Sequence, residues 1–113
     1  PIDSIMVDYA KPQDNANRSD IRSLSTSGID MPLIKIQGID LFNFRAWTYL
    51  EEDLEKADYP FQLPERDYIN LNIDSEIHGV GGNDGWGART MDQYTIDGNK
   101  ERSFEFIIEA LYY

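Results

Sequence analysis

The stretch that decides the fold spans residues 33–47 and reads Leu33-Ile34-Lys35-Ile36-Gln37-Gly38-Ile39-Asp40-Leu41-Phe42-Asn43-Phe44-Arg45-Ala46-Trp47. Its first part, 33–37, alternates apolar and polar side chains as a half-buried strand does. Its second part, 42–47, repeats this pattern with two phenylalanines and an alanine on one face. The link at 38–40 is short enough for an antiparallel hairpin. Trp47 falls on the face opposite the phenylalanines, so it is either at a contact between elements or exposed.

Other extended segments lie on both sides of this predicted hairpin. Alternation and apolar content predict strands at 2–7, 21–25, 68–74 (with Ile69, Leu71 and Ile73 inward) and 104–110 (with Phe104, Phe106 and Ile108 on one face), and an extended segment at 89–96. A turn is predicted at 97–100. The chain thus has about five to seven candidate strands.

One short helix is predicted near 49–57. Thr48 and Glu51 have the spacing of a capping box, in which the hydroxyl and the carboxylate each bind a free backbone N–H group. Leu50, Leu54 and Ala57 then form one apolar stripe. The acidic residues between them are expected to be a solvated helix face with no acid–base role.

Successive strands are joined by turns, and no spacing typical of a β-α-β unit occurs. We therefore expect an all-β protein, an antiparallel β-sandwich, in a single domain of residues 1–113. The chain begins at Pro1 without an initiator methionine, which we interpret as a processed product or an excised segment.

Composition excludes several classes of function. The chain has ten Lys and Arg residues against 21 Asp and Glu, a net charge of -11, which argues against nucleic acid or an anionic membrane surface as a partner. Because there are no cysteines, a disulfide scaffold, a thiol nucleophile and thiolate zinc sites are excluded. No signal peptide and no apolar run of membrane-spanning length occurs. The compartment stays open, cytoplasmic or periplasmic.

A glycine-rich loop at 78–89 carries the strongest functional signal. It reads His78-Gly79-Val80-Gly81-Gly82-Asn83-Asp84-Gly85-Trp86-Gly87-Ala88-Arg89 and holds five of the eight glycines. Glycine permits backbone conformations that strain other residues and lets another surface come close. Trp86 is therefore either a cap that folds back on the core or a contact platform for a ligand.

Other chemistries at this loop have weak support. The third glycine of a dinucleotide-binding pattern is replaced by Asp84, and no lysine completes a phosphate-binding loop. A metal site at Asp74, Glu76, His78 and Asp84 matches no calcium-loop spacing. A serine triad has His78 as its sole candidate histidine, without a nucleophile elbow. With 21 acidic residues, carboxylate pairs for glycoside hydrolysis carry no signal by themselves. We therefore assign no catalytic residue and no metal ligand. A carbohydrate ligand fits the loop better, because sugar rings stack their apolar C–H faces on tryptophan.

Four ordered motifs carry a family resemblance. They are Pro12-Gln13-Asp14-Asn15-Ala16-Asn17-Arg18-Ser19-Asp20-Ile21-Arg22; Phe42-x-Phe44-x-Ala46-x-x-Tyr49-x-x-Glu52-Asp53-Leu54; Pro64-x-Arg66-Asp67-x-Ile69; and Leu71-Asn72-Ile73-Asp74 followed by Gly79-Val80-Gly81-Gly82-Asn83-Asp84-Gly85-Trp86-Gly87-Ala88. Together they resemble the C-terminal domain of the large bacterial β-galactosidases of glycoside hydrolase family 2. The chain departs from the family pattern at Asp14, Ala16, Asn83 and Gly85, which stand where the family has Glu, Gly, Asp and Ser.

This resemblance implies a segment of a galactose mutarotase-like supersandwich. It implies that Trp86 stacks on the leaving-group sugar of a galactoside, and that Gly81, Gly82, Asn83, Asp84 and Gly85 support it. The catalytic glutamates and the magnesium and sodium or potassium ions of the parent enzyme would belong to its barrel domain, so we expect no cofactor in this segment. The implied partners are the rest of that chain and the galactoside, in a homo-oligomeric parent.

Three functions remain open. The first is an inactive C-terminal segment that completes the substrate site of a β-galactosidase. The second is a free-standing carbohydrate-binding β-sandwich. The third is a structural or oligomerisation module, which would expose apolar surface and self-associate.

Overall fold

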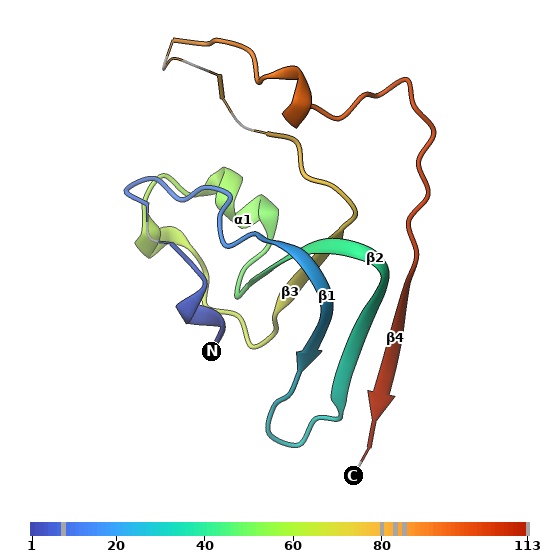
Figure 1. Cartoon of the computed structure of the whole chain (residues 1–113). Helices are drawn as coiled ribbons and strands as arrows, with labels where there is room; N and C mark the ends of the chain where they lie inside the picture. Colours follow the sequence, from blue (N-terminus) through green and yellow to red (C-terminus); the bar gives the residue numbers. More distant parts are fainter. Residues whose placement is uncertain (8, 80, 83, 85, 113) are drawn as a thin grey trace. The chain divides into compact units, whose positions relative to one another are not determined.

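The computed structural model in Figure 1 describes residues 1–7, 9–79, 81–82, 84 and 86–112. Its regular elements are, in chain order, η1 (Ile2–Ser4), β1 (Arg18–Thr26), β2 (Leu33–Trp47), α1 (Glu51–Lys56), η2 (Pro60–Gln62), β3 (Asn70–Asp74), η3 (Asp92–Tyr94) and β4 (Phe106–Leu111), where η denotes a 3-10 turn. The predicted all-β class with one short helix near 49–57 is confirmed. No helix in the described residues is long and apolar enough to cross a bilayer.

The four strands of the described residues form one sheet around β2. β1, β2 and β3 are neighbours in that order, and β4 also pairs with β2. The β2–β4 ladder is antiparallel, from Leu33 opposite Leu111 to Gly38 opposite Phe106. A second layer, as a sandwich requires, is not among the described residues, so the sandwich and supersandwich assignments stay predictions.

The predicted hairpin at 38–40 is wrong, because β2 is one strand of 15 residues. The ladder with β4 continues through Gly38, and the N–H of Ile39 donates to the carbonyl of Glu105 at 3.4 Å. Backbone partners from a distant segment therefore replace the local turn. Glycine is needed at position 38, since a Cβ atom there would lie 2.2 Å from the carbonyl oxygen of Asp40.

The chain divides into two compact units, and the first consists of Pro1–Asp20 and Asn43–Ile73. Its core is a cluster of Ala16, Trp47, Tyr49 and Leu54, against which Ile5, Met6 and Leu63 pack. Trp47 is 1% exposed, and its ring stacks on Tyr49 with centroids 5.6 Å apart. Of the two alternatives for Trp47, the contact between elements is therefore the correct one.

The second unit consists of Ile21–Phe42 and the described residues from Asp74 onward. Ile36 and Phe42 are buried in it. β4 differs, because all six of its residues are exposed. The single-domain prediction for residues 1–113 stays a prediction.

The helix begins in the predicted place but is capped differently. Its N-cap is Leu50, whose N–H donates to Oδ2 of Asp53 at 2.8 Å. The predicted box of Thr48 and Glu51 is wrong, because Glu51 is already the first helical residue. Its carboxylate instead accepts hydrogen bonds from Asn72, at 2.7 Å, and from a side chain of β2.

Arg66 holds the capping carboxylate from the other side. Its guanidinium donates two hydrogen bonds to Asp53, at 2.8 and 2.9 Å. These bonds, followed by the one from the backbone of Leu50, lower the pKa of Asp53 below its usual value of 3.8. The ionised carboxylate therefore joins the helix start to the segment that leads into β3.

Two predicted extended segments are 3-10 turns. Residues 2–7 contain η1, in which the N–H of Ile5 donates to the carbonyl of Ile2 at 3.0 Å. Residues 89–96 contain η3, which the N–H of Thr95 closes by donating to Asp92 at 3.2 Å. In both segments, short-range hydrogen bonds take the place of the expected strand pairing.

The outcome for the predicted strand at 68–74 is mixed. β3 is confirmed at Asn70–Asp74, and Leu71 and Ile73 are half-buried. Ile69 lies before the strand and is 47% exposed, so its predicted inward orientation is wrong. The turn at 97–100 is confirmed by a hydrogen bond from the N–H of Lys100 to the carbonyl of Asp97 at 3.4 Å.

Candidate functional site

Trp86 lies on the surface of the second unit. Its side chain is 95% exposed, the highest value among the described large apolar residues. In the described residues it therefore does not cap the core of its own unit, as the first alternative requires. An exposed indole is compatible with a contact platform, whose ligand stays a prediction.

The backbone around Trp86 is held by Asp84. One carboxylate oxygen, Oδ1, accepts hydrogen bonds from the N–H of Trp86 at 2.8 Å and from the N–H of Ala88 at 3.2 Å. Such bonds from a side chain to its own following backbone are typical of aspartate in turns. The carboxylate thus constrains the peptide groups on both sides of the indole.

The base of the glycine-rich loop is closed by three hydrogen bonds. The N–H of Gly79 donates to the carbonyl of Tyr94 at 2.7 Å, and the Thr90 hydroxyl donates to the carbonyl of Gly79 at 2.9 Å. The N–H of Ile96 donates to Nδ1 of His78 at 3.1 Å. Because this ring nitrogen accepts, a neutral His78 carries its proton on Nε2. These bonds therefore connect the segment that precedes Trp86 to the segment that follows it.

Two of the predicted supporting glycines have a clear conformational role. Gly81 has φ of 76°, which other residues adopt with strain. At Gly82 a Cβ atom would lie 2.5 Å from the carbonyl oxygen of Arg89, so the returning chain leaves no room for a side chain. Asn83 and Gly85, the other two predicted supporting residues beside Asp84, lie outside the described residues.

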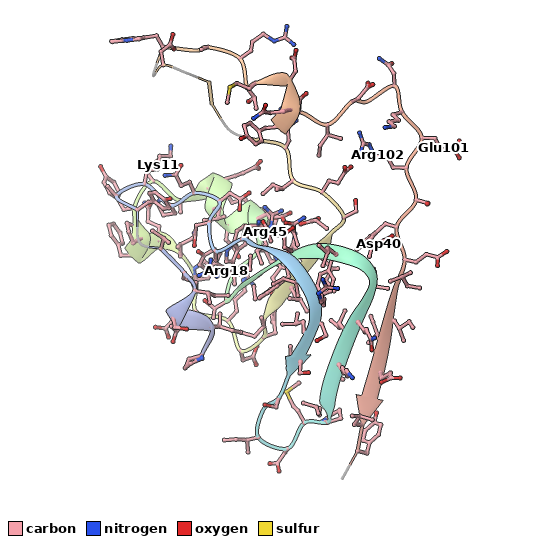
Figure 2. The ribbon with its side chains drawn as sticks, viewed as in Figure 1. Lys11, Arg18, Asp40, Arg45, Glu101 and Arg102 are labelled. Carbon is pink, nitrogen blue, oxygen red and sulfur yellow. The ribbon has the colours of Figure 1, made fainter. Side chains whose placement is uncertain are left out.

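The metal site considered at Asp74, Glu76, His78 and Asp84 is not supported. Within the described ranges, no three His, Cys, Asp or Glu side chains gather to hold an ion. Glu76 pairs with Arg102, which is labelled in Figure 2. His78 and Asp84 accept from backbone N–H groups. Glu76, His78 and Asp84 are therefore engaged by other groups of the protein in place of a metal ion.

The upstream loop at 12–18 is anchored in the first unit by Asn15. Its carbonyl accepts a hydrogen bond from Nε1 of Trp47 at 3.1 Å, and its Oδ1 accepts one from the N–H of Val7 at 3.0 Å. The next residue, Ala16, is buried and has φ of 66°, a left-handed conformation that favours glycine. The family that the sequence resembles has glycine at this position. The loop is therefore a support of the first core.

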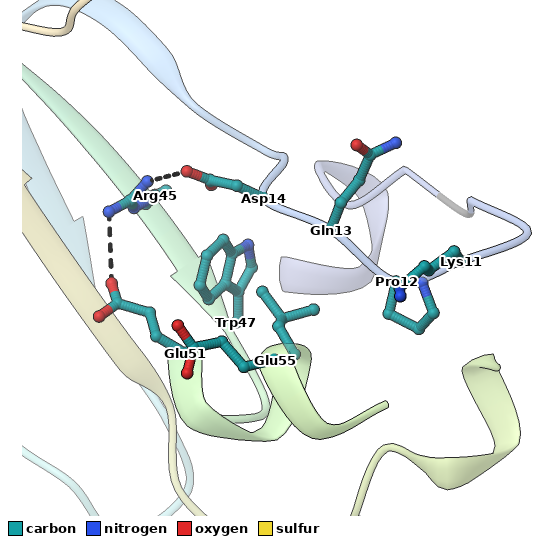
Figure 3. Close-up of a pocket in the computed structure, with 9 residues that line it drawn as sticks. Lys11, Pro12, Gln13, Asp14, Arg45, Trp47, Glu51 and Glu55 are labelled. Atoms are coloured by element: carbon teal, nitrogen blue, oxygen red, sulfur yellow. Dashed lines mark hydrogen bonds and ion pairs between the residues drawn. The ribbon is translucent and has the colours of Figure 1, made fainter. Parts of the chain in front are cut away.

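A pocket of about 360 Å³ lies beside this loop (Figure 3). It is lined by Lys11, Pro12, Gln13, Asp14, Arg45, Trp47, Glu51, Leu54 and Glu55. Arg45 donates to Asp14 at 2.5 Å and to Glu51 at 3.3 Å, and its guanidinium lies 5.2 Å from the ring centroid of Trp47. This arginine joins the loop, β2 and α1.

Sequence reasoning missed the role of Arg45. A signal was available, because residues two apart on a strand share a face, and Arg45 stands two before the large aromatic Trp47. The spacing does not indicate the two acidic partners of Arg45, which come from other segments of the chain.

Comparison with known proteins identifies relatives over most of the chain. A family model described as beta galactosidase small chain matches residues 1–108. The β-galactosidase of Halalkalibacterium halodurans is 27% identical over 111 residues, which are 97% of this chain and 11% of that protein. The β-galactosidase of Lactobacillus delbrueckii subsp. bulgaricus is 30% identical over 105 residues, 89% of this chain and 10% of that protein.

A shorter relative is the β-galactosidase small subunit of Latilactobacillus sakei. It is 39% identical over 67 residues, which are 59% of this chain and 21% of that subunit. The chain therefore spans about a tenth of the length of the β-galactosidases that it matches, and about a fifth of this subunit.

Proposed function

The chain belongs to the beta galactosidase small chain family, and from this premise we propose that it is the part of a β-galactosidase that completes the substrate site without carrying catalytic groups. The parent enzyme would hydrolyse terminal non-reducing β-D-galactose residues of β-galactosides such as lactose. The contribution of this chain would be Trp86, a platform on which the leaving-group sugar stacks.

The observation that carries this proposal is the exposure of Trp86 on a constrained loop. An indole that is 95% exposed offers its ring to a ligand, and the loop beneath it is closed by hydrogen bonds at its base and at Asp84. Sugar rings present apolar C–H faces, which pack on aromatic rings. A platform on a loop with a fixed backbone loses less conformational entropy on binding.

We propose that the chain has no catalytic activity by itself. Glycoside hydrolysis requires two carboxyl groups on opposite sides of the scissile bond, one of them a free proton donor. Of the three carboxylates that line the pocket of the first unit, Asp14 and Glu51 are occupied by hydrogen bonds from Arg45, so Glu55 has no second uncommitted carboxylate beside it in that lining. The two catalytic glutamates would belong to the parent's barrel domain.

The metal ions of the parent would also be held outside this chain. This placement is supported by the described residues, among which no group of three His, Cys, Asp or Glu side chains occurs. We assign no step of the reaction to a metal in this chain. Its partners would be the barrel domain and the galactoside, within a homo-oligomeric parent.

The test is Trp86→Ala in the full-length enzyme. We expect the KM for lactose to rise about threefold to tenfold, the size of one aromatic contact, with kcat changed less. Phe61→Ala is the matched control, because Phe61 is also an exposed aromatic, at 83%, and lies on η2 in the other unit. Equal KM values for both variants would remove Trp86 from the site.

Inactivity is tested with the purified 113-residue chain and a chromogenic galactoside. We expect no turnover above the uncatalysed rate, and hydrolysis at rates typical of enzymes would contradict the proposal.

The exposure of Trp86 also suits a second function, a free-standing carbohydrate-binding module. Calorimetric titration of the purified chain with lactose separates the two. Binding at millimolar concentration or tighter would favour the module, and absence of heat would favour the site-completing role. A third function, oligomerisation through the exposed face of β4, would appear as self-association in light scattering.

A further inference from the structure

We infer that Asp84 is the positioning residue of the Trp86 platform, and that it acts as a hydrogen-bond acceptor for the loop backbone. This inference rests on the proposed function of Trp86. It assigns to Asp84 a specific task, which is to fix the direction in which the indole leaves the loop.

The geometry places one carboxylate oxygen between two backbone donors. Oδ1 of Asp84 lies 2.8 Å from the nitrogen of Trp86 and 3.2 Å from the nitrogen of Ala88. The two donors flank the Cα atom of Trp86 in the chain, one belonging to its own residue and one lying two residues later. The carboxylate therefore limits rotation of the backbone before and after the indole.

Among the described residues, none packs closely enough on the indole to hold it. Because Trp86 is 95% exposed, the described residues of the second unit do not enclose its ring. Gly87 follows with φ of 107°, and glycine restricts the backbone less than any other residue. The orientation of the platform must therefore come from backbone hydrogen bonds, and those to Asp84 are the ones that enclose it.

The task requires an acceptor and does not require a charge. Both donors are uncharged peptide N–H groups, and an asparagine side chain offers a carbonyl oxygen in the same place. Asparagine at this position should therefore keep the platform, whereas alanine should release it. If the carboxylate instead acted on the substrate through its charge, Asp84→Asn would raise the KM as much as Asp84→Ala does.

Releasing the loop should weaken ligand binding without changing the chemical step. A mobile Trp86 has to be ordered when the sugar binds, and this cost appears in affinity. The two bonds are solvent-exposed, so their loss corresponds to about a threefold to tenfold rise in KM. The kcat for a galactoside with a small aryl leaving group should stay within about twofold.

The experiment is a variant series in the full-length enzyme, with KM and kcat measured for lactose. We expect Asp84→Ala to raise the KM about threefold to tenfold and Asp84→Asn to stay within about twofold of the wild type. Asp92→Ala, in η3 just after the loop, is the matched control, because the bonds that Asp92 accepts from Thr95 use its backbone carbonyl. In a Trp86→Ala background, Asp84→Ala should add no further rise, since the platform is already absent.

The outcomes separate this inference from the function on which it rests. If Trp86→Ala leaves the KM unchanged, the proposed platform fails and the role of Asp84 fails with it. If Trp86→Ala raises the KM but Asp84→Ala matches Asp92→Ala, only the positioning role is refuted. If Asp84→Asn is as impaired as Asp84→Ala, the charge is what matters, and the acceptor role is refuted.

Discussion

Replacing Trp47 by phenylalanine should destabilise the first unit strongly. Trp47 is 1% exposed, stacks on Tyr49 and donates from Nε1 to the carbonyl of Asn15 at 3.1 Å. Trp47→Phe keeps an aromatic ring but removes this donor. It also reduces the volume that fills the core between β2 and the loop at 12–18.

The expected loss is the sum of three effects. The carbonyl of Asn15 loses its partner, which costs about 1–3 kcal/mol. The smaller ring leaves unfilled volume, for about 0.5–1.5 kcal/mol. The guanidinium of Arg45, 5.2 Å from the indole centroid, loses part of a cation–π contact worth about 0.5–1 kcal/mol. Together they predict a decrease of roughly 2–5.5 kcal/mol in the free energy of unfolding, a large share of the stability of a small protein.

The assay is urea denaturation of the 113-residue chain, with Trp86→Phe as the control. Because Trp86 is 95% exposed, its replacement should change the free energy of unfolding by less than about 0.5 kcal/mol. Each variant keeps one tryptophan, so fluorescence reports the two sites separately. Trp86, left in Trp47→Phe, should emit as in water before and after unfolding. Trp47, left in Trp86→Phe, should shift to longer wavelength as its core opens.

Two results would refute this reasoning. If Trp47→Phe and Trp86→Phe have the same urea midpoint and slope, Trp47 is not the centre of a cooperative core. If the emission of the tryptophan left in Trp86→Phe does not shift on unfolding, Trp47 is not buried in solution.

Two further predictions concern the helix start and the loop. The folded pKa of Asp53 lies below 3.8, so its ionised form should contribute its full stability above that pH and lose it as the pH falls through the lowered folded pKa. Urea midpoints of wild type and Asp53→Asn over a pH series should therefore converge in acid, and a constant difference would contradict this. Gly82→Ala should loosen the loop, because its Cβ atom would lie 2.5 Å from the carbonyl of Arg89, whereas Gly98→Ala meets no atom within 4 Å. We expect the amide of Gly79 to exchange faster in Gly82→Ala than in Gly98→Ala. Equal exchange in the two variants would count against the close approach of Gly82 to Arg89.

The predictions that succeeded depended on local pattern. Alternation predicted β3 and β4, and the spacing of Leu50 and Leu54 predicted a helix in the right place. The glycine-rich loop was recognised because its composition permits backbone conformations that other sequences do not, as Gly81 and Gly82 show. The family resemblance was carried by ordered motifs and agrees with the family model over residues 1–108.

Two of the predictions that failed involved partners outside the local segment. The turn at 38–40 was predicted from Gly38, but the backbone there pairs with β4. Glu51 was expected to cap its own helix, but Asn72 and Arg45 engage its carboxylate. Asn72 is 21 residues from Glu51 in the sequence, and no local pattern indicates that the fold will bring this side chain to the helix start.

The two tryptophans show the division between sequence and tertiary structure. The sequence alone determined the all-β class, the family and the choice of Trp86 as the candidate site residue, because strand periodicity, glycine content and motif order are properties of short segments. Whether each tryptophan is buried was decided only by the tertiary structure. Trp47 is enclosed because Asn15 and Leu54 reach it from other segments and Tyr49 stacks on its ring. Trp86 is 95% exposed on a loop whose backbone is held by Asp84.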